Sequence, residues 1–355
     1  MMLSYASSTL SQPLRSHEGT VTPLLRVKDL TLGFPMPAFR HGVGLVVQHL
    51  SFEVFPGEWV ALVGESGCGK SMTLQAILNL LPPRGLITQG EVWFMAQNLL
   101  TLPEKDLRKI RGGKLALIPQ DPLTALNPVY TLGNQMTEVI QVHKGVSQAM
   151  AKKLALELLD LVQIPDAPRR FHAYPHELSG GMRQRGMIAM ALSCQPKLLL
   201  ADEPTTALDV TVQAQIMALL EQVRREMNTA ILMITHDLGV VAESADRIGV
   251  MYAGELVEYG TRSQVLDTPE HPYTQALLQA IPDGLSHDAG TLMTIEGVPP
   301  GIRDPLTLGC AFAPRCMRVA PHCREHTPVL QEVGFGHKAL CWYPASKLGQ
   351  TNASE

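Results

Sequence analysis

The sequence has no run of about 18 apolar residues, the length that a membrane-spanning helix needs. Its longest uncharged stretch, Pro122 to Thr137, is interrupted by polar residues such as Asn127 and Gln135. We therefore expect other chains to make any membrane crossing. No Lys or Arg and no continuous apolar core precede Arg15, so no secretory signal is predicted and we expect a cytoplasmic protein.

The chain also lacks an excess of positive charge. It has 29 Lys and Arg against 33 Asp and Glu, a formal charge of −4, and no dense basic block. Nucleic-acid binders need such a block to neutralise phosphates, so no nucleic acid is expected as a partner. Charged residues are 17% and hydrophobic residues 45% of the 355 residues, which favours a large folded core over disorder.

Cysteines are few, and four of the six lie near the C-terminal end, at Cys310, Cys316, Cys323 and Cys341. In a reducing cytosol such a group indicates a metal before disulfides. The closest two are six positions apart, a poor match to zinc sites, which begin with two cysteines about two to four residues apart. Ferredoxin-type spacing does not fit either. Zinc, an iron–sulfur cluster and unliganded or partly oxidised thiols stay as alternatives.

Glycine and proline, 29 and 26 residues, are plentiful. These residues flank short apolar runs, which predict buried strands. The runs are Trp59–Val63, Leu115–Ile118, Leu198–Ala201, Ile231–Thr235 and Ile248–Met251. Between them, 147–163 and 210–227 place apolar residues on one helical face. This alternation predicts an α/β fold with a mostly parallel sheet. We expect a flexible tail at 1–23, a main domain at 24–283 and a small Cys-rich extension at 284–355.

A phosphate-binding loop follows the first predicted strand and leads into a helical run from Met72 to Leu81. Strand, glycine-rich loop and helix in this order form a P-loop, which classes the fold as a P-loop NTPase. Glycines let backbone N–H groups face the phosphates, Lys70 adds a positive charge, and the Ser71 hydroxyl binds Mg²⁺. We assign nucleotide binding to Gly64, Glu65, Ser66, Gly67, Cys68, Gly69, Lys70, Ser71 and Met72.

Two adjacent acids, Asp202 and Glu203, end another apolar strand. Asp202 can hold a water of the Mg²⁺ shell, and Glu203 can polarise an attacking water. A capping or turn role is the alternative. We favour the metal role because paired carboxylates at a buried strand end are costly without a cation.

Leu178-Ser179-Gly180-Gly181-Met182 precedes a further helical pattern, and Ser179 is expected to cap that helix. With the two preceding motifs, this string resembles the signature of an ATP-binding cassette (ABC) ATPase. The resemblance extends to Gln120 as the Q-loop, to Ala207-Leu208-Asp209 as the D-loop and to His236 as the H-switch.

The resemblance implies a role for each of these residues. Gln120 would sense Mg²⁺ and couple to membrane subunits, Asp209 would communicate across a dimer, and His236 would hold the γ-phosphate beside the catalytic Glu203. Each ATP would lie between one chain's P-loop and the other chain's Ser179, Gly180 and Gly181. The helical region near 121–190 would form a subdomain that docks a permease.

Longer strings at 121–128, 182–190, 202–215 and 271–273 resemble ATPase subunits of bacterial oligopeptide and dipeptide importers, over about residues 24–345. This implies ATP hydrolysis on the cytoplasmic face of the inner membrane, with two transmembrane permease subunits and an external substrate-binding protein. Met182 implies a heterodimer with a homologous second ATPase subunit. Some relatives hold a [4Fe-4S] cluster on four such cysteines. The alternatives are an importer ATPase for nickel, glutathione or another small solute, and a soluble regulatory ABC ATPase.

Overall fold

The computed structural model describes residues 22–39, 42–205, 209–280, 295–302 and 308–347. Its main sheet has eight strands in the order β11-β12-β10-β9-β3-β8-β7-β6. Five of them run parallel, namely β6 (Leu115–Ile118), β7 (Leu198–Asp202), β8 (Ala230–Thr235), β3 (Trp59–Val63) and β9 (Arg247–Tyr252). These are the five predicted strands, with ends that agree within one residue. The predicted parallel sheet is therefore confirmed.

A second, antiparallel sheet was not predicted. It has the strand order β2-β1-β4-β5 and consists of β1 (Leu25–Pro35), β2 (Val43–Val54), β4 (Leu86–Phe94) and β5 (Gln97–Asn98). The pairing of β1 with both neighbours contains register shifts. Such irregularities interrupt the alternation of inward and outward residues that identifies a strand in a sequence.

The main sheet separates two hydrophobic cores because alternate strand residues face opposite sides. In β3, Val60 and Leu62 join the core that contains residues of the second sheet and of helix α1 (Lys70–Ile77). Trp59, Ala61 and Val63 join the core on the other side. Both faces of β3 are covered, so the loop that follows it starts from a rigid strand.

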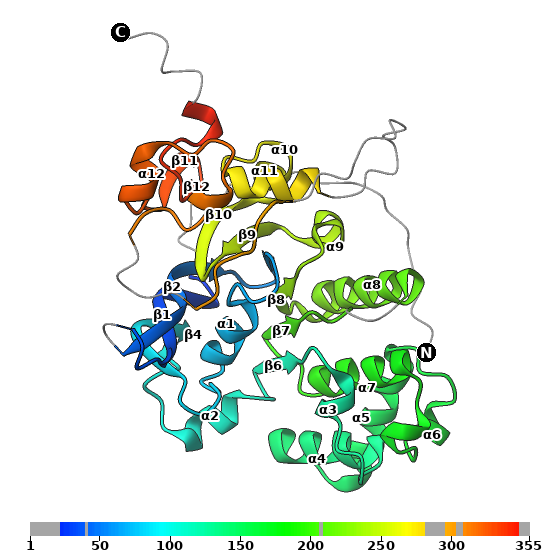
Figure 1. Cartoon of the computed structure of the whole chain (residues 1–355). Coiled ribbons are helices and arrows are strands. Elements are labelled where there is room, and N and C mark those ends of the chain that lie inside the picture. The colour runs from blue at the N-terminus through cyan, green and yellow to red at the C-terminus, as the bar shows by residue number, and fades with distance from the viewer. Residues whose placement is uncertain (1–21, 40–41, 206–208, 281–294, 303–307, 348–355) are drawn as a thin grey trace.

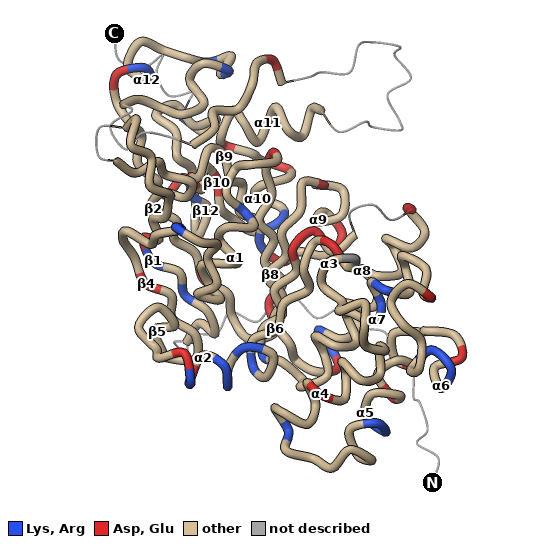
Figure 2. The backbone as a smooth tube through the Cα atoms, turned by 60° about the horizontal axis from the view of Figure 1, so that its bottom comes forward, with Lys and Arg blue, Asp and Glu red and all other residues tan. Residues whose placement is uncertain are grey.

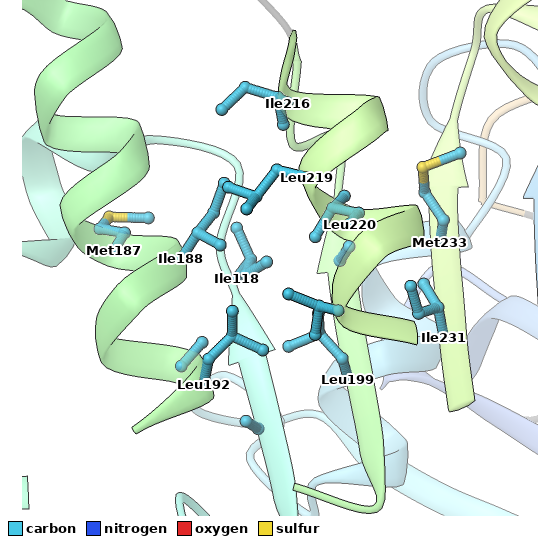
Figure 3. Close-up of a cluster of buried hydrophobic side chains, with 14 of the residues drawn as sticks. Ile118, Met187, Ile188, Leu192, Leu199, Ile216, Leu219, Leu220, Ile231 and Met233 are labelled. Carbon is cyan, nitrogen blue, oxygen red and sulfur yellow. The ribbon is translucent and has the colours of Figure 1, made fainter. Parts of the chain in front are cut away.

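A group of helices packs beside the sheet and coincides with the predicted helical region (Figure 1). It comprises α3 (Pro122–Ala125), α4 (Leu132–Lys144), α5 (Gln148–Leu161), α6 (Ala167–Arg170) and α7 (Gly180–Leu192). Figure 3 shows how α7 joins it to the sheet: Ile188 points toward Leu219 of α8 (Val210–Met227), and Leu192 lies near Leu199 of β7.

The remaining α-helices are α2 (Glu104–Ile110), α9 (Leu238–Ser244), α10 (Arg262–Asp267), α11 (Pro272–Gln279) and α12 (Pro321–Glu325). In α2 the two signs of charge lie close together (Figure 2), with acids in the first turn and bases in the last. This order complements the helix dipole. Within the described ranges, no helix has the length and apolarity needed to cross a membrane.

The C-terminal residues return to the main sheet, although the predicted boundary near residue 283 lies outside the described residues. Strands β11 (Gln331–Gly334) and β12 (His337–Ala339) form a hairpin, and β12 pairs with β10 (Glu255–Thr261). His337 Nε2 lies 2.8 Å from Glu258 Oε1, and both side chains are buried. Glu258 also accepts hydrogen bonds from the backbone N–H groups of Glu270 and His271. This buried pair therefore fastens the hairpin to the sheet.

We predict that His337→Ala loosens this hairpin. Removing one partner of a buried hydrogen bond leaves the other partner unsatisfied, and because two backbone donors remain on Glu258 we expect a loss of about 2 kcal/mol. Native-state hydrogen exchange of β12 measures this free energy of opening. His49→Ala is the control, because His49 pairs with Asp29 at the same 2.8 Å on the surface and should lose less than about 1 kcal/mol. Equal losses would contradict the prediction.

Candidate nucleotide-binding site

The predicted site residues follow four neighbouring strands. The P-loop follows β3, His236 follows β8, Asp202 and Glu203 end or follow β7, and Gln120 comes shortly after β6. Because these strands are parallel and adjacent, their carboxyl ends meet at one edge of the sheet, where α/β folds bind ligands. The topology thus collects residues that are far apart in the sequence.

Glycines determine the shape of the P-loop. Gly64 has φ 155°, Gly67 has φ 81°, and Gly69, with φ 102°, is the N-terminal cap of α1. A Cβ atom on Gly64 would lie 2.2 Å from the Met251 carbonyl oxygen, and one on Gly69 would lie 2.7 Å from that of Val46. Larger residues are therefore excluded by backbone contacts as well as by conformation.

The Lys70 ammonium is held inside the loop. Its Nζ donates to the carbonyl oxygens of Gly64 at 2.7 Å and Glu65 at 3.0 Å, and lies 3.7 Å from Cys68 Sγ. Lys70 is only 5% exposed. Burial raises the pKa of the Cys68 thiol. The arrangement keeps a positive charge where phosphate oxygens would bind.

Ser71 and Asp202, the two predicted Mg²⁺ residues beside the P-loop, are in contact. Ser71 Oγ donates to Asp202 Oδ1 at 2.9 Å. Burial raises the pKa of Asp202, the Ser71 hydrogen bond opposes that rise, and the charge of Glu203 adds to it. A divalent cation would relieve this penalty, because it stabilises the charged carboxylate. The pair therefore fits the hydroxyl and carboxylate side of a Mg²⁺ site.

The Glu203 carboxylate lies between the side chains of Gln120 and His236. Gln120 Nε2 donates to Glu203 Oε2 at 3.2 Å, and His236 Nδ1 lies 3.3 Å from the same oxygen. The Glu203 side chain is 12% exposed and that of His236 is 57% exposed. Glu203 also has φ 46°, an uncommon conformation for a residue other than glycine. The geometry places a carboxylate where it could orient a water next to the P-loop.

The predicted signature and D-loop residues lie at helix starts. Ser179 caps α7 as predicted, and its Oγ accepts a hydrogen bond from the Met182 N–H. Ser179 and Gly180 are exposed, whereas Gly181 is half-buried. Asp209 caps α8 by accepting from the Val212 N–H. Ala207 and Leu208 of the predicted D-loop lie outside the described residues.

Comparison with known proteins agrees with this geometry. The family model "ABC transporter" matches residues 47–206, and "Oligopeptide/dipeptide transporter, C-terminal region" matches residues 257–323. A probable peptide ABC transporter ATP-binding protein, y4tR of Sinorhizobium fredii, is 50% identical over 90% of this chain and 94% of its own length. The oligopeptide transport ATP-binding protein OppD of Haemophilus influenzae is 48% identical over 92% of this chain and 99% of its own length.

The chain belongs to the oligopeptide/dipeptide ABC transporter ATP-binding family. Among solved structures, the ATP-binding cassette MJ0796, in a dimeric post-hydrolysis state with ADP and Pi, superposes with a TM-score of 0.60. It is 29% identical and covers 67% of this chain and 98% of its own. The ABC fold is thus shown, and the match to ATP-binding transporter subunits supports ATP hydrolysis by this ABC ATPase.

Two residues that sequence reasoning missed hold the P-loop of this ABC ATPase from outside. The Glu65 N–H donates to Tyr273 Oη at 3.0 Å, and the Glu65 carboxylate pairs with both terminal nitrogens of Arg315, at 2.7 and 3.0 Å. Each residue lies in or directly beside a part of the sequence already named. Tyr273 ends His-Pro-Tyr at 271–273, and Arg315 precedes Cys316.

The four clustered cysteines line one small pocket, with a cavity volume of about 20 Å³. All are free thiols. Burial raises the pKa of Cys310 to about 11 and also raises the pKa of Cys316 and Cys341, while the charge of Arg318 opposes the rise at these two. Across the described part of the chain, no three His, Cys, Asp or Glu side chains are placed to hold a single metal ion. The pocket thus collects the four predicted ligands, but the predicted metal site is not confirmed among the described residues.

We predict that Glu203→Gln leaves MgATP binding nearly intact and slows hydrolysis at this P-loop by about a hundredfold or more. The amide keeps the shape but cannot act as a base. Single-turnover hydrolysis in a complex whose partner site is also disabled measures the effect. Glu243→Gln, which changes an exposed carboxylate of α9, is the control. Wild-type rates in the Glu203 variant would contradict the assignment.

Proposed function

We propose that this ABC ATPase supplies the energy for importing oligopeptides or dipeptides. The observation that carries the proposal is the match along nearly the whole chain to peptide transport ATP-binding proteins. The match of residues 257–323 to an oligopeptide/dipeptide transporter region supports the same substrate class. Bound ATP would be held by the P-loop and its Mg²⁺ by Ser71 and Asp202, and Glu203 would act on water.

A complete ATP site would require a second cassette. The chain's signature residues cap α7, in the helical group beside the sheet, whereas its P-loop begins α1 between the two sheets. Ser179 and Gly180 are exposed at a helix N-terminus, which presents N–H groups and a positive dipole end to an anion on another chain. We propose a homologous second ATPase subunit, two transmembrane permease subunits and an external substrate-binding protein as partners, at the cytoplasmic membrane face.

Peptide-stimulated ATPase activity of the purified complex, reconstituted in vesicles with its binding protein, tests the substrate class. We expect oligopeptides or dipeptides to raise the rate of hydrolysis. Stimulation only by nickel, glutathione or another small solute would replace the peptide assignment. An ATPase that associates with no permease would support a soluble regulatory role instead.

We predict that Ser179→Arg lowers hydrolysis of the partner's ATP by about a hundredfold, because it removes a preorganised oxyanion contact and adds bulk at the interface. The variant chain should still bind MgATP by itself. Ser147→Arg is the matched control, since Ser147 caps α5 with the same bond to the N–H three residues on and is also exposed. If the isolated chain hydrolyses ATP as fast as the complex at every concentration, the shared-site proposal fails.

We further propose that the cysteine pocket holds a [4Fe-4S] cluster. Four cysteine thiolates are the ligand set of such a cluster, and all four cysteines line this one pocket. The Arg318 N–H donates to Cys316 Sγ at 3.3 Å, a contact that favours cluster thiolates. Binding converts buried thiols to thiolates, so the cluster would stabilise a segment with few apolar residues.

We predict that anaerobically purified protein contains about four iron and four sulfide per chain. Cys316→Ser should lose the iron and should raise hydrogen exchange in residues 308–347 while MgATP still binds. Cys194→Ser is the control, because Cys194 lies outside the pocket. Stoichiometric zinc, or metal-free protein after protected purification, would reject the cluster and leave the ATPase assignment intact.

A further inference from the structure

A buried ion pair joins the P-loop to the cysteine-rich segment. Arg315 ends a short 3₁₀ helix, Ala313–Arg315, and its side chain is 4% exposed. Both of its terminal nitrogens bond to the Glu65 carboxylate, which is 26% exposed. A bidentate hydrogen bond of this kind fixes the relative orientation of the two side chains as well as their distance. The side chains of the two residues are thus locked together.

The remaining donors of Arg315 are also occupied. Nε donates to the Glu296 carbonyl at 2.9 Å, Nη2 reaches the Ile295 carbonyl at 3.3 Å, and Nη1 reaches Tyr252 Oη at 3.4 Å. The bond to Glu65 is the largest cause of a raised pKa of Arg315. Fully bonded, this guanidinium is fixed in place.

The Glu65 backbone is fixed as firmly as its side chain. Its N–H donates to Tyr273 Oη, and its carbonyl oxygen accepts from Lys70 Nζ at 3.0 Å. The residue that carries this carboxylate is therefore in direct contact with the ammonium that meets the phosphates. An unpaired carboxylate here would repel a triphosphate, because charges at this range interact measurably even with solvent screening.

We propose that Arg315 is a positioning residue for ATP binding, which neutralises Glu65 and holds it away from the nucleotide phosphates. The inference deepens the proposed ATP-driven function and rests on it, but it needs neither the transported solute nor a cluster. Because Arg315 directly precedes Cys316, the structure of the cysteine pocket sets the position of the guanidinium. Phe312, in the same segment, packs on Tyr252 and Tyr273, with ring centroids 5.2 and 5.3 Å apart.

The test is a double-mutant cycle of Arg315 and Glu65, in which calorimetric titration of the full-length chain measures the Kd for MgATP. Arg315→Gln should raise the Kd about tenfold, because Glu65 is left uncompensated. Glu65→Gln should instead lower the Kd about threefold, because Arg315 is left as a free positive charge. The double variant should return to within about twofold of wild type. Arg315→Lys keeps the positive charge but cannot form the bidentate hydrogen bond, and it should recover most of the affinity for MgATP.

A purely structural role gives a different pattern, in which both single variants and the double variant bind weakly. That result would overturn the proposal, as would an Arg315→Gln defect that persists unchanged at high salt, since a repulsion is screened. Arg324→Gln, an exposed arginine of α12, is the control and should bind as wild type does. Wild-type protein that binds no MgATP would contradict the proposed function itself.

The link to the pocket is tested by adding Cys316→Ser to two backgrounds. In the wild-type background it should raise the Kd for MgATP about threefold, because a change in the pocket shifts the neighbouring Arg315 backbone. In the Glu65→Gln/Arg315→Gln background it should have no effect. An equal effect in both backgrounds, or none in either, would show that the pocket does not act through this ion pair.

Discussion

The parallel pairing of β3, β8, β7 and β6 is the constraint on which the nucleotide site depends. Each strand is covered on both faces, so its carboxyl end is fixed to within the tolerance of a packed core. Loops attached to such ends need little ordering of their own. This is why residues as distant as Lys70, Asp202 and His236 meet without a disulfide or a domain interface to bring them together.

The parts of the fold that were predictable are those buried on both sides. β7 and β8 are continuous apolar runs because no residue in their centres meets water. By contrast, β1 alternates irregularly and contains register shifts, so no simple period identified it. Helix α1 ends at Ile77, before the predicted Leu81, because Asn79 takes a left-handed conformation, φ 51°, that turns the chain out of the helix.

Some residues of the site were also predictable from the sequence, and others were not. Motif residues were predictable because phosphate and Mg²⁺ chemistry demands particular groups at fixed spacing along one loop or strand end. Arg315 and Glu65 are 250 positions apart, and no local chemistry at either position indicates the other. Cysteine spacing likewise could not separate zinc from a cluster. In the structure all four thiols line one pocket, but no three metal-binding side chains of the described residues are placed to hold a metal ion.

Bonds among its own residues hold the site together. Lys70 Nζ is bonded to loop carbonyls, Ser71 to Asp202, and Gln120 to Glu203. Phosphate oxygens and Mg²⁺ would have to replace these partners, so binding exchanges hydrogen bonds and gains mainly from charge. Because hydrogen bonds are only exchanged, the affinity for nucleotide depends mainly on the net charge around the P-loop. One extra uncompensated carboxylate matters more here than a lost hydrogen bond, which places the Arg315–Glu65 pair within the energetics of ATP binding.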